Sequence, residues 1–362
     1  MVTALLILLI GLFTSFIWLV AISPGHPAPL LDQSGQVVPS SISERVMIRI
    51  GGIQQGLIIQ SANPANPVLL FLHGGPGMTE FFMEQEYPTG LEQHFTMAWW
   101  DQRGAGMSFS ADIAPETMTM KQMIADTVEV ADYLRARFRK DRIVLLGHSW
   151  GSYLGIQVAA GAPERFIAYV GMAQIVHQLR SEIMARDYLL GAFGEQGDRA
   201  MVNALEAAPV TFEDGLSPAW MLLRDRAMHR MGVGHTRNIH SVITGIFLPV
   251  WKVRAYSVTD KINVWRGKIW SRPFFWDKLL RDDLSTRLTD FAMPIFFFVG
   301  RHDYTANPEL SRTYFEAICA PVKGFYVFEN SAHSPLFEEP RRATEILLHD
   351  VLKSTNSLAD AR

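Results

Sequence analysis

Short, continuous runs of apolar residues recur along the chain and alternate with longer segments of helical periodicity. Runs of this kind predict strands that are buried on both faces. The predicted strands cover residues 67–72, 95–100, 143–146, 165–171, 293–300 and 323–328. The predicted helices between and after them cover residues 118–139, 153–160, 308–318 and 340–352. The alternation is typical of an α/β fold with a mostly parallel sheet covered by helices on both faces.

A hairpin is predicted ahead of the first of these strands. Residues 45–50 and 54–59 have the character of two short strands on either side of the pair Gly51-Gly52. Two short strands joined by two glycines are a hairpin signal. We therefore expect an antiparallel pair before the parallel sheet begins.

The strand and helix alternation stops between residues 174 and 288. This segment is helical in character, is rich in Met, Trp and Phe, and has no convincing buried strand. We predict that it forms a helical cap inserted between two parts of one sheet domain, residues 44–173 and 289–354. Residues 355–362 are expected to form a disordered tail.

The first 22 residues carry no charge and are almost all apolar. A run of this length matches the thickness of a bilayer, and a Pro- and Gly-rich linker over residues 23–43 follows it. The segment lacks a basic n-region and a clear Ala-x-Ala cleavage site, so an uncleaved membrane anchor is favoured over a signal peptide. We expect the rest of the chain to lie outside the cytoplasm; secretion after cleavage is the alternative.

Composition excludes several classes of function. The 362 residues have a net charge of -3, which argues against a general nucleic-acid binder. A single cysteine rules out an intrachain disulfide and a cysteine metal cage. The 11 histidines show no His-x-x-x-His or His-Glu-x-x-His spacing, so no metal site is predicted.

One predicted strand ends in a motif that can present a nucleophile. The sequence GHSWG, with Ser149 at its centre, has the Gly-x-Ser-x-Gly pattern between a strand and a helix. Such a turn is too tight for side chains at the two glycines, and it exposes the central hydroxyl. The pattern often arises by chance, so its weight depends on partners elsewhere in the chain.

A serine nucleophile needs a base, and the base needs a group that orients it. In a sheet of this kind the partners follow later strands, in the order serine, acid, histidine. Asp303 follows the strand at 293–300, and His333 follows the strand at 323–328. We therefore predict a triad of Ser149, Asp303 and His333, with His333 as general base and then general acid. Taken singly, the last two could be an ordinary turn residue and an ordinary histidine.

The oxyanion formed by serine attack needs two hydrogen-bond donors that are already in place. One is expected to be the backbone N–H of Trp150, which follows the nucleophile. The other is expected from the glycine-rich loop HGGPG at residues 73–77, through Gly74 or, preferably, Gly75. The competing interpretation of this loop is a plain tight turn.

Five stretches together resemble the proline iminopeptidase family of α/β-hydrolases. They are HGGPG at 73–77, DQRGAGMS at 101–108, GHSWGS at 147–152, GRHD at 300–303 and AHS at 332–334. The resemblance covers about residues 44–354. It implies an α/β-hydrolase fold with a cap, release of N-terminal residues from peptides through an acyl-enzyme, and no cofactor. It also implies that Asp101 and Arg103 brace the oxyanion loop.

The cap is where the chain departs from the family pattern. Members of the family hold the free α-amine of the substrate with cap glutamates. Glu182, Glu213 and Asp214 are the candidates here, although each could equally lie on a solvated helix face. Residues 252–281 carry eight Lys or Arg among several aromatic residues, which does not favour a cationic substrate if they face the pocket.

The basic and aromatic stretch also suggests that the cap contacts an anionic membrane surface. The alternative is an amphipathic cap helix with its aromatic side chains packed inward. Two further functions stay open: an esterase or amidase for a small lipophilic acyl substrate, and a non-catalytic ligand-binding protein on the same fold. The sequence does not determine the oligomeric state.

Overall fold

The computed structural model describes residues 2–360, apart from the side chains of residues 2–5, 7, 8 and 12. Its centre is an eight-stranded sheet with the order β1-β2-β4-β3-β5-β6-β9-β10. The strands are β1 (Ile42–Ile50), β2 (Ile53–Ser61), β3 (Val68–Leu72), β4 (Thr96–Asp101), β5 (Ile143–His148), β6 (Phe166–Met172), β9 (Ile295–Gly300) and β10 (Lys323–Phe328). Strands β1 and β2 are antiparallel, β2 is antiparallel to β4, and all other pairs are parallel. The predicted hairpin and the mostly parallel sheet are both confirmed.

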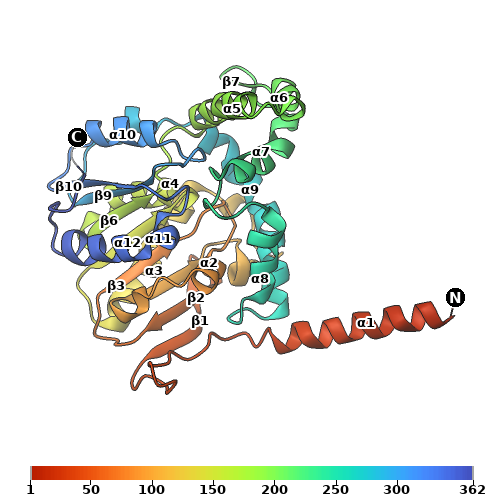
Figure 1. The fold of residues 1–362 in the computed structure, drawn as a ribbon. Helices are drawn as coiled ribbons and strands as arrows, with labels where there is room; N and C mark the ends of the chain where they lie inside the picture. The colour runs from red at the N-terminus through yellow and green to blue at the C-terminus, as the bar shows by residue number, and fades with distance from the viewer. Residues whose placement is uncertain (1, 361–362) are drawn as a thin grey trace.

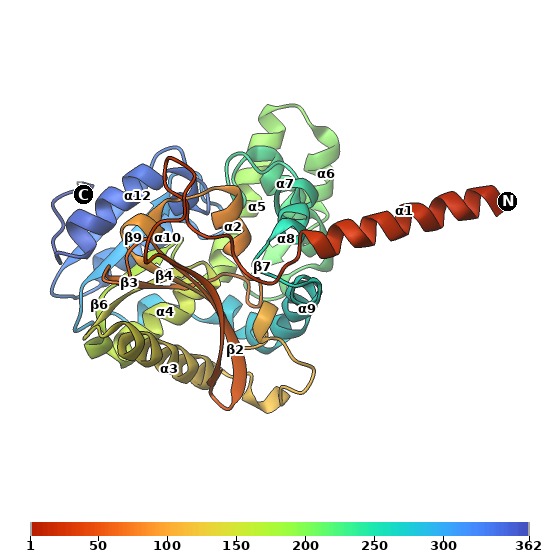
Figure 2. The ribbon, with the colours of Figure 1, turned by 90° about the horizontal axis from the view of Figure 1, so that it is seen from below.

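Helices cover both faces of the sheet (Figures 1 and 2). They are α2 (Phe81–Glu86), α3 (Met120–Phe138), α4 (Trp150–Gly161), α10 (Pro308–Ala317), α11 (Pro335–Glu338) and α12 (Pro340–Ile346). Strand β3 shows why its apolar run has no polar gaps. Leu70 and Leu72 pack in a core with α3 and α4, whereas Leu69 and Phe71 pack on the opposite face with α2 and α12. Successive side chains of a strand point to opposite faces, so a doubly covered strand needs apolar residues throughout.

The cap is inserted between β6 and β9 and lies along one side of the sheet domain (Figure 1). Its helices are α5 (Gln178–Glu195), α6 (Arg199–Glu206), α7 (Pro218–Met231), α8 (Leu248–Lys252) and α9 (Val258–Arg281), with a small hairpin of β7 (Val210–Thr211) and β8 (Gly215–Leu216). Helices α5, α6 and α7 share an apolar core of their own around Trp220 and Phe193. Helix α9 joins the cap to the sheet domain, because Phe275 packs on Trp150 with 4.9 Å between ring centroids.

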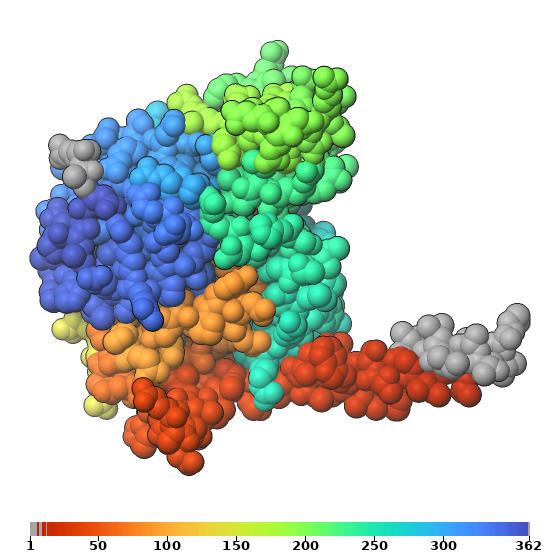
Figure 3. All heavy atoms as spheres, viewed as in Figure 1, coloured from red at the N-terminus to blue at the C-terminus, as the bar shows by residue number. Residues whose placement is uncertain are grey.

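Helix α1 (Val2–Ala21) projects away from the body of the protein (Figures 1 and 3). Its described side chains are exposed and mostly apolar, for example Phe13 and Trp18. The chain after its last turn is held by α9, where Lys261 Nζ donates to Ile22 O at 3.2 Å and to Ser23 Oγ at 2.7 Å. Within the described residues, no helix combines the length and the apolarity needed to cross a bilayer. The anchor predicted over residues 1–22 includes Met1 and seven side chains that lie outside the described residues.

The predicted disordered tail is wrong for residues 355–360. The Asp350 carboxylate accepts hydrogen bonds from Thr355, Ser357 and the backbone of Leu358. The Asp360 backbone N–H then donates to Phe325 O on β10. A single buried carboxylate therefore orders a segment whose own sequence carries no strong structural signal; residues 361–362 lie outside the described residues.

Candidate active site

The turn between β5 and α4 places Ser149 in a backbone conformation that few non-glycine residues adopt. Its φ is 55° and its ψ is -119°, and its N–H donates to Met172 O at 3.1 Å. A Cβ on Gly147 would lie 2.3 Å from Gly151 O, and a Cβ on Gly151 would lie 2.0 Å from Leu72 O. Positions 147 and 151 must therefore be glycine, and the tight turn exposes the Ser149 side chain at the edge of the sheet.

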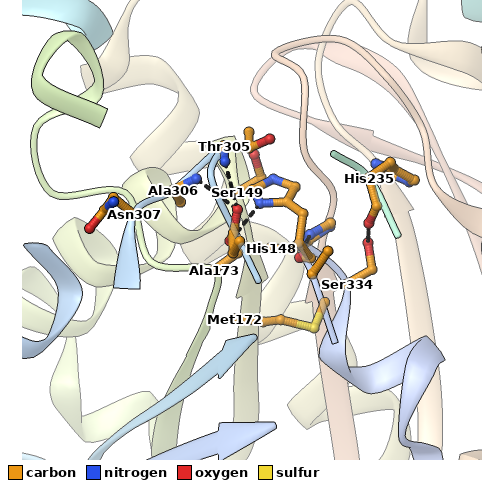
Figure 4. Close-up of polar contacts among 12 residues, drawn as sticks. His148, Ser149, Met172, Ala173, His235, Thr305, Ala306, Asn307 and Ser334 are labelled. Atoms are coloured by element: carbon orange, nitrogen blue, oxygen red, sulfur yellow. Dashed lines mark hydrogen bonds and ion pairs between the residues drawn. The ribbon is translucent and has the colours of Figure 1, made fainter. Parts of the chain in front are cut away.

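Asp303 and His333 form a buried hydrogen-bonded pair after β9 and β10. The distance from His333 Nδ1 to Asp303 Oδ2 is 2.8 Å. The other oxygen, Oδ1, accepts the backbone N–H groups of Thr305 at 2.8 Å and Ala306 at 2.9 Å (Figure 4). These contacts fix the carboxylate, and the carboxylate in turn fixes the proton of His333 on Nδ1 and leaves Nε2 as an acceptor.

Ser149 and His333 line the same cavity, of about 180 Å³. The structure thus brings together all three residues of the predicted triad. Among the hydrogen bonds of the described residues there is none between the Ser149 hydroxyl and His333. Catalytic hydrogen bonds are often long or poorly aligned before a substrate binds, so the lack of this hydrogen bond does not exclude proton transfer from Ser149 to His333.

Of the predicted oxyanion donors, Gly75 lines this cavity, and Trp150 and Gly74 lie next to Ser149. Trp150 is the first residue of α4, so its N–H has no partner within the helix and lies at the positive end of the helix dipole. Gly75 lines the cavity and has a φ of 118°, which disfavours any side chain. Gly74 is close to the nucleophile, since a Cβ on it would lie 3.3 Å from Ser149 Cβ.

Gln102 braces the oxyanion loop, a role that was not predicted from the sequence. Its side-chain amide donates to His73 O at 2.9 Å, and its backbone N–H donates to His73 Nε2 at 3.1 Å. Its Oε1 accepts the Trp150 indole N–H at 2.9 Å. Gln102, directly after β4, therefore joins the loop after β3 to the turn after β5. The three loops lie close together because β3 lies between β4 and β5 in the sheet. The signal for Gln102 in the sequence is its place in the DQRGAGMS motif, between Asp101 and Arg103.

Asp101 and Arg103 are structural, as predicted, but their contacts are not with the oxyanion loop. Asp101 accepts from the Met107 N–H at 2.9 Å and from the Tyr256 hydroxyl of the cap at 2.8 Å. Burial raises the pKa of Asp101 to about 7, against the effect of these hydrogen bonds. Arg103 forms a buried ion pair with Asp126 of α3 at 2.7 Å.

A second carboxylate–imidazole pair lies beside the triad and was also missed. Glu80 Oε2 is 2.9 Å from His148 Nδ1, and His148 Nε2 is 2.8 Å from the backbone oxygen of His333. The rings of His148 and His333 are 4.9 Å apart. Through these contacts, His148, the residue before the nucleophile, links Glu80 to the backbone of His333. Glu80 follows the predicted oxyanion loop, and its distance in sequence from His148 left no local signal.

The loop that carries His333 is held by Glu338. Its carboxylate accepts backbone N–H groups of Arg237 at 2.6 Å, Ala332 at 2.9 Å and Ser334 at 3.2 Å. Burial raises the pKa of Glu338 to about 7, although these three hydrogen bonds oppose the effect. Ser334 also donates to His235 O at 2.7 Å (Figure 4), so the same loop is attached to the cap.

The structure does not bring the three acids predicted to bind substrate to the Ser149 cavity. Glu182 is fully buried, and its oxygens bond to Arg224 at 2.7 Å, to the Trp220 indole at 2.9 Å and to Gln178 at 2.8 Å. Its side chain serves the packing of α5 against α7. Glu213 and Asp214 are exposed in the β7–β8 hairpin. Asp214 lines a different hollow of about 430 Å³.

Cap residues close the cavity above Ser149. Met228 and Ile246 supply apolar surface, and Asp225, His235 and Lys268 supply polar groups. Burial lowers the pKa of His235 to about 3, so its ring is neutral. Its buried Nε2 has no hydrogen-bond partner among the described residues. Within the described part of the chain, no cluster of His, Cys, Asp and Glu suits a metal ion.

Known proteins resemble the chain over most of its length. The family model for the alpha/beta hydrolase fold matches residues 67–340. The probable aminopeptidase YbaC of Bacillus subtilis is 32% identical over 312 residues, covering 84% of this chain and 95% of that protein. The proline iminopeptidase of Heyndrickxia coagulans is 24% identical over 288 residues, covering 79% and 90%.

Solved structures share the fold. The proline iminopeptidase-related protein of Thermus thermophilus superposes with a TM-score of 0.60 at 20% identity, covering 86% of this chain and 98% of that one. The proline iminopeptidase of Mycobacterium smegmatis gives a TM-score of 0.59 at 17% identity, with the same coverage. The family match, the sheet order and the serine turn agree, and the chain belongs to the α/β-hydrolase family, with a probable aminopeptidase and proline iminopeptidases among its relatives.

Proposed function

We propose that the protein is a serine hydrolase that releases N-terminal residues from short peptides through an acyl-enzyme. The observation that carries the proposal is that Ser149, Gly75 and the His333 of the bonded pair Asp303–His333 line one cavity, with Trp150 directly after the nucleophile at the start of α4. The similarity to a probable aminopeptidase over 84% of the chain supports a peptide substrate. The small cavity supports a substrate of one or two residues on the acyl side.

Each residue has a defined part in the reaction. His333 Nε2 takes the proton of Ser149 as its oxygen attacks the scissile carbonyl, and Asp303 stabilises the imidazolium that forms. The N–H groups of Trp150 and Gly75 bind the developing oxyanion, and each donor is worth about 3 kcal/mol in the transition state. His333 then protonates the departing amine. Water, activated by the same histidine, hydrolyses the acyl-enzyme and restores Ser149.

Labelling with a fluorophosphonate probe tests the reaction type. We expect the wild-type protein to be labelled at Ser149 and the Ser149→Ala variant to be unlabelled and inactive on prolyl-naphthylamide. Labelling at another residue would reject Ser149 as the nucleophile, and no labelling of the folded wild-type protein would support the non-catalytic alternative. The assay needs no knowledge of the natural substrate.

A second candidate function is an esterase or amidase for a small lipophilic acyl group. It is favoured by the apolar lining of the cavity, to which Met78, Phe82, Met228 and Ile246 contribute. The turnover of p-nitrophenyl butyrate and of prolyl-naphthylamide separates the two functions. Ester turnover without any aminopeptidase turnover would reject the peptidase and leave the serine mechanism in place.

We also propose that the protein acts at a membrane surface outside the cytoplasm. Phe13 and Trp18 on α1 and Ile269 on α9 expose their apolar side chains by 64%, 58% and 76%. Exposed apolar side chains combined with basic residues suit an anionic lipid interface. Co-sedimentation of the protein with anionic liposomes at low salt tests this, with Ile269→Glu reporting on the cap. Absence of binding would contradict the proposal.

A further inference from the structure

Glu80 presents an unused carboxylate oxygen to the active-site cavity. The residue lies between the predicted oxyanion loop and α2, is 4% exposed and lines the cavity with Ser149 and His333. Its Oε2 is bonded to His148, whereas Oε1 has no hydrogen-bond partner among the described residues. Oε1 lies 2.8 Å from the point where a Cβ on Gly74 would sit, and Ser149 Cβ lies 3.3 Å from the same point. The free oxygen and the nucleophile therefore face one small space.

The hydrogen bonds of His148 define the charge of Glu80. Both ring nitrogens of His148 face oxygen atoms, the Glu80 carboxylate at 2.9 Å and the His333 carbonyl at 2.8 Å. A carbonyl only accepts, so Nε2 carries a proton, and a carboxylate at Nδ1 requires a second one. Burial by itself would raise the pKa of Glu80, but the charge and the hydrogen bond of His148 outweigh it and lower the pKa. Burial by itself would lower the pKa of His148, but the charge and the hydrogen bond of Glu80 outweigh it and raise that pKa. Glu80 is thus an anion with one oxygen unsatisfied, and a buried anion of this kind attracts a cationic donor.

Other acids near the cavity have their partners within the protein. Glu182 is saturated by Arg224, Trp220 and Gln178. Asp225 lines the cavity, but its Oδ1 bonds to Arg224 at 2.8 Å and its side chain is 56% exposed, so its charge is paired and solvated. Asp303 uses both of its oxygens to hold the triad. Glu80 differs from these acids in combining burial with a free oxygen next to Ser149.

We propose that Glu80 Oε1 binds the protonated α-amine of the substrate and so determines specificity for a free N-terminus. The proposal rests on the proposed aminopeptidase function. It assigns the amine site to the loop that follows the oxyanion glycines, in place of the cap acids expected from the sequence. His148 then has a second role, since it keeps the carboxylate ionised and turned so that Oε1 faces the nucleophile. A hydrogen bond between charged groups contributes about 10- to 100-fold to kcat/KM.

Two substrates that differ only in the amine test the assignment. Prolyl-4-nitroanilide carries the ring nitrogen, and cyclopentanecarboxylic acid 4-nitroanilide replaces it with carbon. We expect Glu80→Gln to lower kcat/KM for the prolyl substrate about 10- to 100-fold more than for the carbocyclic substrate, mainly through KM, since any effect through His148 acts on both substrates alike. Glu84→Gln is the matched control, because Glu84 lies on the adjacent helix and bonds to Thr89, away from the cavity. It should leave both substrates unchanged.

The outcomes separate this proposal from the proposed function. If Glu80→Gln weakens both substrates equally, Glu80 is not the amine site, although the hydrolase function stands. If the wild-type protein hydrolyses only the carbocyclic substrate, the aminopeptidase function fails, and the amine site fails with it. Inhibition of ester turnover in the wild-type protein gives a test that needs no variant. Prolinamide should inhibit at least about 10-fold more strongly than cyclopentanecarboxamide at neutral pH, and equal inhibition would overturn the assignment.

Discussion

Replacing Asp303 with Asn should remove the orientation of the catalytic base while it keeps the shape of the site. The two backbone N–H groups of Thr305 and Ala306 point at Oδ1 at 2.8 and 2.9 Å. They require an acceptor, so the amide oxygen of the Asn must take this place. The NH₂ group then faces His333 Nδ1, where the carboxylate oxygen lay at 2.8 Å.

An NH₂ donor at this position changes which nitrogen of His333 holds the proton. Nδ1 must now accept, and the ring proton moves to Nε2, which can then no longer act as a base toward Ser149. The loss expected for a wrong tautomer is about 10⁴-fold in kcat, which corresponds to about 5.5 kcal/mol of barrier. Because both backbone hydrogen bonds persist, the free energy of unfolding should fall by only about 1–2 kcal/mol.

Turnover of p-nitrophenyl butyrate measures kcat, and the rate of fluorophosphonate labelling reports on the nucleophile separately. Asp290→Asn is the control, since it makes the same chemical change at an exposed residue outside the cavity. Both rates should fall together in Asp303→Asn and stay unchanged in Asp290→Asn. A folded Asp303→Asn protein with less than about a 10-fold loss in kcat would show that Asp303 does not set the tautomer of the base.

Three further predictions concern stability and the oxyanion loop. Burial raises the pKa of Glu84 to about 8 in the folded protein. Below the ordinary pKa of a glutamate the contribution of Glu84 to the free energy of unfolding is full. It is lost as the pH rises toward 8, because the unfolded chain releases this proton first. Unfolding curves between pH 4.5 and 8 should show this decline, at most about 5 kcal/mol, and it should be missing in Glu84→Gln; an equal slope in both proteins would contradict the burial argument. Arg103→Met leaves Asp126 buried without its cation and should cost about 3–5 kcal/mol in urea unfolding, where a cost below about 1 kcal/mol would refute the structural role of the pair. In Gly75→Ala a Cβ would lie 2.6 Å from Gly77 N, so kcat should fall about 10²- to 10³-fold; unchanged ester turnover would exclude the Gly75 N–H as an oxyanion donor.

Several features followed from the sequence because they depend on local pattern. Strands that are buried on both faces must be continuously apolar, so β3, β5 and β9 were visible as runs of aliphatic and aromatic residues. The turn at Ser149 requires glycine on both sides. In an α/β sheet the functional loops follow the carboxyl ends of strands. This rule alone was sufficient to place Asp303 and His333 in one site.

The tertiary structure decided which polar groups meet across the sheet. The sequence allows Glu182 as an amine ligand, but in the fold Arg224 and Trp220 of α7 occupy its carboxylate. Glu80 reaches His148 because β3 and β5 are neighbours in the sheet, although the two residues are 68 positions apart in the chain. A hydrogen-bond partner leaves no periodic trace in the sequence, since it requires only one atom at the right distance. The proposed reaction type therefore rests on the order of motifs along the chain, whereas the proposed choice of substrate rests on a buried carboxylate oxygen that only the fold leaves free.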